Sequence, residues 1–461
     1  MRRFVALLTL ALASGAALAQ EVLSDEKFWE WEKDKITTAE HRARRDAVRA
    51  ALPDNTALIV ATNPMQVRSN DTDFQFRPDS NFWYLTGCEE PESIAIISKT
   101  PFDWGGKTGI TEAVFVLDRN PGMETWTGYR LGPARAANVL GFQASFSSRD
   151  FEGCLQAMAT AGAKFAKTPS ILNAPYVNLL SKLGQVTTWI TPVNEMRYIK
   201  GPAEIALIRR AAQISAMGHV ETIRSCDESM REYDLQGLVE YMFKRGGCEF
   251  PAYGSIVGCG PNSTVLHYPS ARRKLNAGEI ICMDTAGEYH GYAADVTRSY
   301  PVSGKFSPEQ KAIYEIVLAA QNAGIAECRN GKSFGAPHQA AQKVITEGLL
   351  KLGIIKEASE TRRYFMHGTS HTIGLDVHDT NARGKGLEPG VCLTVEPGIY
   401  IKAGSPCDKK WWNIGIRIED DILVTEGEPE NMSKACPRTV AEIEALMSQK
   451  GIGNMPIKPA K

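Results

Sequence analysis

Gly278-Glu279-Ile280-Ile281-Cys282-Met283-Asp284 is an apolar stretch that ends on an acid, and it predicts a buried β-strand. Tyr289-His290-Gly291 predicts a turn, and Tyr292–Tyr300 predicts the returning strand. With the turn centred between residues 289 and 290, Asp284 and Asp295 become cross-strand partners whose Cβ atoms lie about 5 Å apart. Carboxylates that close repel each other and raise one pKa, and a divalent cation removes that penalty. Two solvated acids at strand ends are the alternative interpretation.

Around this hairpin, the C-terminal part of the chain repeats one outline. Each half has two predicted helices, followed by strands that carry polar residues. The first half comprises helices 203–226 and 230–245 and strands carrying His267, Asp284 and Asp295, and the second comprises helices 308–328 and 336–352 and strands carrying His371, Glu396 and Glu419. Ser307-Pro308-Glu309-Gln310 is a helix start, with a cap, a first-turn proline and a glutamine three residues after the cap. The repeat predicts a pseudo-twofold α+β domain with a site between its halves.

Another strand carries polar residues on one face. In Gly415–Glu419 the isoleucines alternate and share one face, so Arg417 and Glu419 share the other. Glu396 ends the apolar stretch that begins at Leu393. Polar residues on one face of an otherwise apolar strand indicate that this face binds a specific group. The alternative for Arg417 and Glu419 is a salt bridge on the sheet surface, and the alternative for Glu396 is a role as a turn residue.

Three of the eight histidines, His367, His371 and His378, fall within twelve residues. The spacing of His367 and His371 also occurs in helical zinc motifs, but the glycine and threonine between them and the missing glutamate favour a Gly-rich loop. A chance cluster is the alternative.

Combined, these residues offer the ligands of a metal site. The four carboxylates and one imidazole belong to Asp284, Asp295, His371, Glu396 and Glu419. Oxygen donors favour manganese, cobalt, iron or magnesium. Four carboxylate charges balance two dications, and a water between two such ions becomes acidic enough to give hydroxide near neutral pH.

Taken in order, the motifs resemble the pita-bread metallopeptidases and, within them, aminopeptidase P. The resemblance runs from about residue 37 to residue 450. It rests on Leu266-His267-Tyr268, Met283–Gly287, Tyr292–Arg298, Phe365–His371, Gly374–Asp379, Val395–Gly398 and Arg417–Asp421, and in the N-terminal part on Phe76–Gly87. One departure is Thr372, which stands where close relatives have a tryptophan. This change is expected to alter the wall of the pocket and to leave the metal ligands unchanged.

The resemblance implies an α/β N-terminal domain over residues 37–192 and an α+β pita-bread catalytic domain with pseudo-twofold halves over residues 193–450. It implies two divalent ions, with manganese expected, held by Asp284, Asp295, His371, Glu396 and Glu419. It implies that His267, His367 and His378 line the substrate site, that Glu396 also acts in catalysis, and that Arg417 supports the site. Trp126 matches a tryptophan that in relatives reaches a neighbouring subunit's active site, so a homo-oligomer, dimer or tetramer, is expected.

The implied reaction is release of the N-terminal residue from peptides with proline in second position. Prolidase, which cleaves Xaa-Pro dipeptides, is the nearest alternative; it must bind the substrate carboxylate behind proline with a committed cation. Arg417 is expected to pair with ligand carboxylates, and Arg298 faces away from Asp295 on a regular strand. Neither is an obvious clamp, which favours the aminopeptidase. A catalytically silent peptide-binding relative, or creatinase-like C–N hydrolysis, is disfavoured because all five ligand residues are present.

The N-terminus predicts export. Arg2 and Arg3 precede the apolar run Phe4–Leu12, and Ala17-Leu18-Ala19 is a small-x-small cleavage site, so residues 1–19 read as a signal peptide of a periplasmic or secreted protein. An uncleaved anchor is the alternative, but the apolar run is shorter than the ~20 residues that a spanning helix needs. The formal net charge of −1 predicts neither nucleic acid nor an anionic membrane surface as a partner.

The remaining N-terminal sequence is less patterned. Residues 21–50 predict a helix, residues 57–87 are strand-like and aromatic, Ala113–Leu117 predicts a buried strand, and residues 124–132 predict a Gly-rich loop. A composition shift near residues 191–201 places the domain boundary near Pro192. The ten cysteines lack CxxC spacing, and most are expected to be buried thiols.

Overall fold

The computed structural model describes residues 34–169, 179–180, 182, 186–380 and 384–455. The chain forms two compact units, Met1–Trp189 and Ile190–Lys461. The expected signal peptide lies outside the described residues. Among the helices that are described, none is long and apolar enough to cross a membrane. All ten cysteines are described and free, and eight of them are buried.

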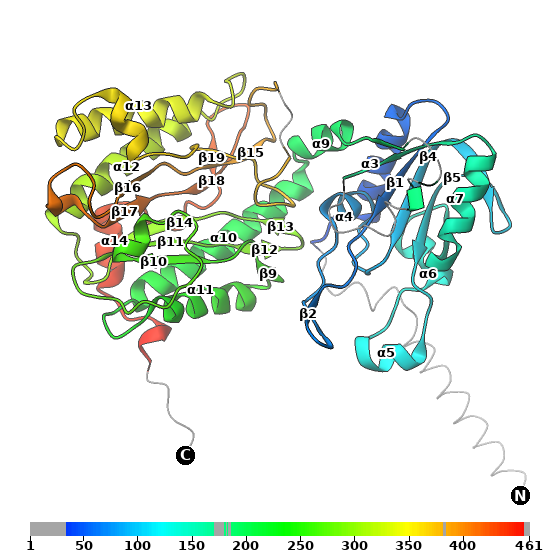
Figure 1. Cartoon of the computed structure of the whole chain (residues 1–461), viewed down its shortest axis with the longest axis horizontal. Coiled ribbons are helices and arrows are strands. Elements are labelled where there is room, and N and C mark those ends of the chain that lie inside the picture. Colours follow the sequence, from blue (N-terminus) through cyan, green and yellow to red (C-terminus); the bar gives the residue numbers. More distant parts are fainter. Residues whose placement is uncertain (1–33, 170–178, 181, 183–185, 381–383, 456–461) are drawn as a thin grey trace, which may run out of the picture. The chain divides into compact units, whose positions relative to one another are not determined.

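The N-terminal unit is an α/β sandwich around a six-stranded mixed sheet in the order β6-β5-β4-β1-β7-β8 (Figure 1). Ile59, Ile96 and Phe115 lie in its buried core, with Phe151 of α7 packed against them. The elements are α3 (Thr38–Ala51), β1 (Thr56–Ala61), β2 (Val67–Ser69), β3 (Thr72–Asp73), α4 (Ser80–Thr86), β4 (Ile94–Trp104), β5 (Lys107–Val116), α5 (Pro121–Thr127), α6 (Pro133–Leu140), β6 (Ala144–Ser147), α7 (Phe151–Thr160), β7 (Lys164–Lys167) and β8 (Val186–Thr188).

Two predictions for this unit were wrong because local capping was overlooked. The strand-like stretch 57–87 ends in the helix α4, whose N-cap Asp79 accepts a hydrogen bond from Phe82 N at 2.9 Å. The expected loop 124–132 begins inside the helix α5, where the Asn120 side chain accepts from Met123 N at 3.1 Å. Of the helix expected over residues 21–50, residues 34–50 are described, and within them the helix α3 begins only at Thr38.

The C-terminal unit has the predicted α+β repeat of two helices followed by strands (Figure 1). The Ser307–Gln310 capping box that starts α12 is confirmed. After α9 (Thr191–Tyr198), the first half comprises α10 (Pro202–Ser225), α11 (Glu232–Gly246), β9 (Phe250–Pro251), β10 (Ile256–Cys259), β11 (Ile280–Asp284), β12 (Gly287–Tyr289), β13 (Tyr292–Ala293) and β14 (Thr297–Pro301). The second half comprises α12 (Pro308–Ala326), α13 (Ala336–Lys351), β15 (Cys392–Val395), β16 (Gly398–Ile401), β17 (Ile414–Arg417), β18 (Asp420–Leu423), β19 (Glu430–Asn431) and α14 (Val440–Met447).

Each half contains one long hairpin that is interrupted midway. In the first half, β11 pairs with β14 and β12 with β13 in a continuous register, although the two pairs belong to different sheets. In the second half, β15 pairs with β18 and β16 with β17, again in one register. The backbone therefore leaves regular pairing once in each half, at equivalent places.

The predicted pairing of Asp284 with Asp295 is wrong. The partner of Asp284 is Thr297. His290 and Gly291 both have positive φ, 49° and 78°, so they are the two central residues of the turn, and the hairpin is centred one residue later than expected. A shift of two in the partner keeps both acids on the same face.

Candidate metal centre

Four buried or half-buried acids gather at the interruptions of the two hairpins. Asp284 is the last residue of β11, and Asp295 lies between β13 and β14. Glu396 lies between β15 and β16, Glu419 between β17 and β18, and the shared register places these two glutamates opposite each other. Because the strands leave their sheets here, the acids turn toward one place.

Side-chain contacts connect this group. The Tyr253 hydroxyl lies 2.5 Å from Oδ1 of both Asp284 and Asp295. His371 Nε2 lies 3.4 Å from Asp295 Oδ2 and 3.6 Å from Glu396 Oε1. Ligand atoms of Asp295, His371 and Glu419 all lie within 4.8 Å of one another. The five residues expected to bind metal are thus brought together.

Burial and mutual repulsion shift the pKa values of these groups. Burial, with Asp295 nearby, raises the pKa of Glu419 well above its usual range, and burial raises that of Glu396 to about 8. Burial and the Asp284 charge raise the pKa of Asp295. Burial disfavours the cationic form of His371, but the Asp295 and Glu396 carboxylates raise its pKa to about 9. The cluster holds more negative charge than its own cations offset, which fits a divalent ion among oxygen donors and one imidazole.

Arg417 is the main cation of the cluster. Its Nη2 donates to Asp284 Oδ2 at 2.5 Å and its Nη1 to the Tyr400 hydroxyl at 2.8 Å. Burial acts against the Asp284 carboxylate, but Arg417 and Tyr253 hold its pKa below the usual value. Arg417 Nε donates to Thr297 Oγ1 at 3.2 Å, and that hydroxyl donates to Glu419 Oε2 at 2.6 Å. Arg417 is therefore committed to the acids, as expected.

The other candidate histidines lie on loops beside the cluster. His367 Nε2 lies 2.9 Å from the Tyr400 hydroxyl, and its Nδ1 lies 3.7 Å from Glu396. The His378 ring centroid is 4.2 Å from that of His371. Burial and Arg417 lower the pKa of His367 to about 4, and burial and His371 lower that of His378, so both are neutral near pH 7.

The expected strand positions of two histidines were wrong. His267 is exposed in a turn after the 3₁₀ helix η2 (Gly260–Thr264), and His371 lies in a loop as part of the Gly-rich segment. The strands β10 and β15 lie on the far sides of these residues in sequence, β10 ending at Cys259 and β15 beginning at Cys392. The expectation of a Gly-rich loop at His367–His371 is confirmed.

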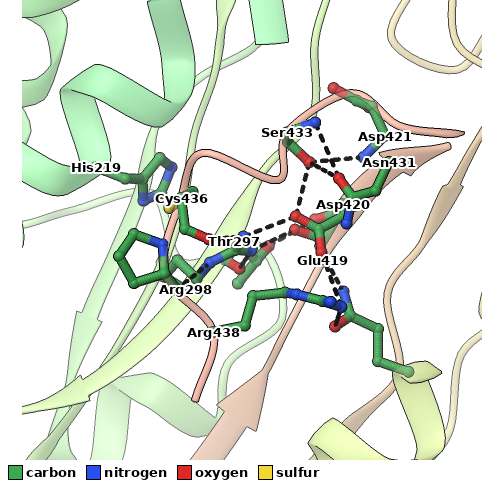
Figure 2. Close-up of polar contacts among 12 residues, drawn as sticks. His219, Thr297, Arg298, Glu419, Asp420, Asp421, Asn431, Ser433, Cys436 and Arg438 are labelled. Atoms are coloured by element: carbon green, nitrogen blue, oxygen red, sulfur yellow. Dashed lines mark hydrogen bonds and ion pairs between the residues drawn. The ribbon is translucent and has the colours of Figure 1, made fainter. Parts of the chain in front are cut away.

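Behind Glu419 lies a second group of polar residues, drawn in Figure 2. Asp420 accepts from Arg298 Nη2 at 2.7 Å and from Ser433 Oγ at 2.7 Å. Arg298 also donates to the carbonyl of Pro437 at 2.9 Å, so it faces away from the cluster, as expected, and is not free to bind a substrate carboxylate.

Sequence reasoning missed three residues that touch the ligands: Tyr253, Thr297 and Asp421. Both carboxylate oxygens of Asp421 accept from the Asp295 backbone N–H, at 3.2 and 3.1 Å. Asp421 and Thr297 stood inside quoted motifs, which is the signal that was available. Tyr253 lies outside those motifs and shows no periodicity that points to the site.

One further buried ion cluster holds the His378 loop. The Asp379 side chain is buried, accepts from Lys200 Nζ at 2.9 Å and contacts the Arg197 guanidinium. These cations hold the Asp379 pKa below its usual range although burial opposes this. Thr372, the departure noted above, donates to the Asp379 carbonyl at 2.7 Å. The residue after His378 is thereby anchored on three sides.

Trp126 lies in the N-terminal unit, on α5, and is 85% exposed. Met123 and Thr127 of the same helix line a cavity of about 1130 Å³ within this unit, together with Phe76, Trp83 and other residues. The indole has the accessibility that a contact with another chain requires.

Comparisons with known proteins agree with this geometry. Residues 206–426 match metallopeptidase family M24, and residues 41–165 match the N-terminal domain of aminopeptidase P. The chain is 36% identical to an Xaa-Pro aminopeptidase of Haemophilus influenzae over 90% of this chain and 98% of that protein, and 35% identical to one of Escherichia coli over the same shares.

Solved structures give the same result. An aminopeptidase of Pseudomonas aeruginosa, PepP, superposes with a TM-score of 0.85 at 33% identity, covering 90% of this chain and 99% of that one. A variant of E. coli aminopeptidase P in complex with substrate superposes with a TM-score of 0.83 at 33% identity and the same coverage. The expected fold class is confirmed.

Proposed function

Because the chain belongs to metallopeptidase family M24 and has the N-terminal domain of aminopeptidase P, we propose that it removes the N-terminal residue from peptides whose second residue is proline. The observation that carries this is the cluster formed by four acids at the hairpin interruptions and by His371 from its loop, in a chain similar over 90% of its length to Xaa-Pro aminopeptidases. A catalytically silent relative would not need this set of ligands.

Asp284, Asp295, His371, Glu396 and Glu419 would hold two divalent ions, with manganese as the proposed metal. When bound, such ions supply Lewis acidity toward the scissile carbonyl and lower the pKa of a water. The oxygen-rich donor set supports manganese or cobalt over softer metals. Removing metal with a chelator is expected to abolish activity, and manganese or cobalt to restore it. Full activity with well under one metal per chain would contradict this assignment.

The remaining side chains handle substrate and protons. His378 and His267 donate hydrogen bonds to the charge that develops on the carbonyl oxygen. Glu396 takes a proton from the attacking water and passes it to the leaving nitrogen, which must be protonated because the proline nitrogen carries no proton in the peptide bond. His367, between Tyr400 and Glu396, shapes the proline pocket.

The assay that tests the reaction compares Xaa-Pro-Xaa with Xaa-Pro peptides in the presence of manganese. Arg417 and Arg298 are both committed inside the protein, which supports an open site without a clamp for the carboxylate of a dipeptide. Tripeptides are expected to have the higher kcat/KM. A tenfold or greater dipeptide preference, about 1.4 kcal/mol, would reassign the protein as a prolidase.

Export and assembly complete the proposal. The segment Arg2–Ala19 supports a periplasmic or secreted enzyme that begins at Gln20 after cleavage, and N-terminal sequencing of protein from the native host tests this. An intact Met1 in soluble cytoplasmic protein would refute it. The exposed Trp126 supports a homo-oligomer, and light scattering of the purified protein would show a dimer or tetramer.

A further inference from the structure

His267 is carried by a segment with little regular structure of its own. The structure describes every residue between η2 and β11, and none from 265 to 279 belongs to a helix or strand. His267 is exposed at the turn in this segment. On the proposed function His267 must present its ring to substrate, so something else has to hold the segment in shape.

One side of His267 is attached to the metal centre. The carbonyl of Leu266, the residue before it, accepts from Arg417 Nη2 at 3.3 Å. The same nitrogen donates to Asp284 Oδ2. This contact places the start of the turn relative to the cluster but leaves the residues after His267 unconstrained.

The other side is attached to Glu232, the first residue of α11, which is 0% exposed. Its Oε2 accepts from the Tyr268 hydroxyl at 3.1 Å and from the Arg273 backbone N–H at 2.8 Å. Its Oε1 accepts from the Cys259 backbone N–H and from Asn262 Nδ2, both at 2.9 Å. One carboxylate thus holds four points of segment 259–273, which includes η2 and the turn at His267: its first residue, its last residue and two residues between them.

In all four hydrogen bonds Glu232 is the acceptor. Two of the donors are backbone N–H groups, which can only donate. A carboxylate offers about four lone-pair positions, so Glu232 is fully used. Among the described residues no Lys or Arg side chain forms an ion pair with Glu232, and a buried acid without such a partner is costly unless its hydrogen bonds are complete. An apolar residue here would leave all four donors without an acceptor, so this stretch of chain depends on the Glu232 carboxylate.

We propose that Glu232 is a positioning residue for His267: its carboxylate holds Tyr268 and the ends of segment 259–273, and thereby aims the His267 ring at the substrate carbonyl. This rests on the proposed function. The four hydrogen bonds of Glu232 go to Cys259, Asn262, Tyr268 and Arg273 and not to a proposed metal ligand, so Glu232 acts only through the histidine.

Glu232→Gln is the most direct test because it keeps the shape of the side chain. One oxygen faces the Cys259 N–H and the other the Arg273 N–H, so either orientation of the amide points an NH₂ at a backbone donor. We expect kcat/KM to fall roughly ten- to hundredfold with metal stoichiometry unchanged. Tyr268→Phe, which removes a single bond and keeps the ring, should lower kcat/KM by less and serves if the first variant folds poorly.

Glu279→Gln is the matched control. Glu279 also binds Arg273, through Nη2 at 2.6 Å, but it bonds to neither neighbour of His267. This variant should keep kcat/KM within twofold of the wild type. A fall equal to that of Glu232→Gln would show that any weakening of the segment has the same effect and would overturn the proposal.

Two measurements separate positioning from general support. In a His267→Ala background, Glu232→Gln should change kcat/KM by less than twofold, since the residue it positions is gone; an undiminished effect overturns the proposal. Amide hydrogen exchange of peptides covering 259–273 should accelerate in Glu232→Gln and not in Glu279→Gln, and unchanged exchange also overturns it. Exchange needs no substrate, so an inactive wild type with the expected exchange would refute the proposed function and with it the role of His267.

Discussion

Glu419 and Asp420 are neighbours in the chain, both acids and both buried, with 1% and 0% exposure, yet their surroundings are opposite. Glu419 faces Asp295 and Glu396, and burial among these carboxylates raises its pKa well above the usual range. Asp420 faces Arg298, Arg438 and Ser433, which hold its pKa low although burial opposes this. Figure 2 shows Asp420 among these partners.

The difference teaches where the counter-charge of a buried acid comes from. Around Asp420 the protein supplies cations and hydroxyl donors, so the ionised acid is part of the folded structure. Around Glu419 the protein supplies too few cations and donors, so the ionised form of Glu419 is stable only with a bound external cation. A buried acid with a complete set of partners supports the fold, and one without points to a ligand.

The largest effect is expected from Glu419→Gln. The change removes a proposed metal ligand, so kcat/KM should fall at least about 1000-fold, roughly 4 kcal/mol, with loss of bound metal. Without metal, Glu419→Gln should be no less stable in urea than metal-free wild type, because the neutral amide avoids the burial and the repulsion from Asp295 that disfavour the carboxylate. Exposed Glu426→Gln should match wild type in both assays. Full metal content and activity in Glu419→Gln would remove Glu419 from the site.

Asp420→Ala should show the reverse pattern. Without this carboxylate the buried Arg298 guanidinium has no counter-charge, and we expect a loss of about 3–5 kcal/mol in the free energy of unfolding. Urea unfolding in the presence of a chelator measures it. Adding Arg298→Met should recover part of the loss, since the unpaired cation is then gone. A cost below about 1 kcal/mol would mean that Asp420 is no better compensated than Glu419.

His219, which lies near Arg298, makes the free energy of unfolding depend on pH. It is fully buried on α10, its Nε2 donates to the Thr285 carbonyl at 2.9 Å, and burial lowers its pKa to about 4. In the unfolded chain the histidine protonates near pH 6.5. Between pH 6.5 and pH 4 the unfolded chain therefore binds more protons than the folded protein, and the free energy of unfolding falls as the pH drops through this range. This contributes about 3 kcal/mol. The loss of unfolding free energy between pH 6.5 and pH 4 should be larger in wild type than in His219→Gln by that amount. Equal losses in the two proteins would contradict the assignment.

Arg438→Ala should have the smallest effect. Arg438 lies 3.4 Å from Asp420 and its side chain is 27% exposed, so solvent screens the pair. We expect a loss of at most about 1 kcal/mol in urea unfolding, with activity unchanged. A loss as large as that of Asp420→Ala would show that Arg438, and not Arg298, compensates the acid.

Much of the fold could be read from patterns of neighbouring residues. The helix at Ser307–Gln310 followed from cap chemistry, and the two αα-then-β halves followed from hydrophobic periodicity. The same local reasoning missed α4 and α5, because the N-caps Asp79 and Asn120 were overlooked beside apolar or Gly-rich sequence. The partner of Asp284 was wrong because one turn position decides the register of a whole hairpin.

By itself the sequence predicted which acids and histidines gather in the cluster, because they stand in recognisable motifs, and it determined the α+β halves, because periodicity is a property of contiguous residues. Only the tertiary structure decided that the acids lie where both hairpins leave their sheets, that Tyr253 bridges Asp284 and Asp295, and that Glu419 lacks the counter-charges Asp420 has. Counter-charge depends on groups brought together from distant positions, such as Arg298 and Asp420, and no local pattern encodes which of two adjacent acids receives it.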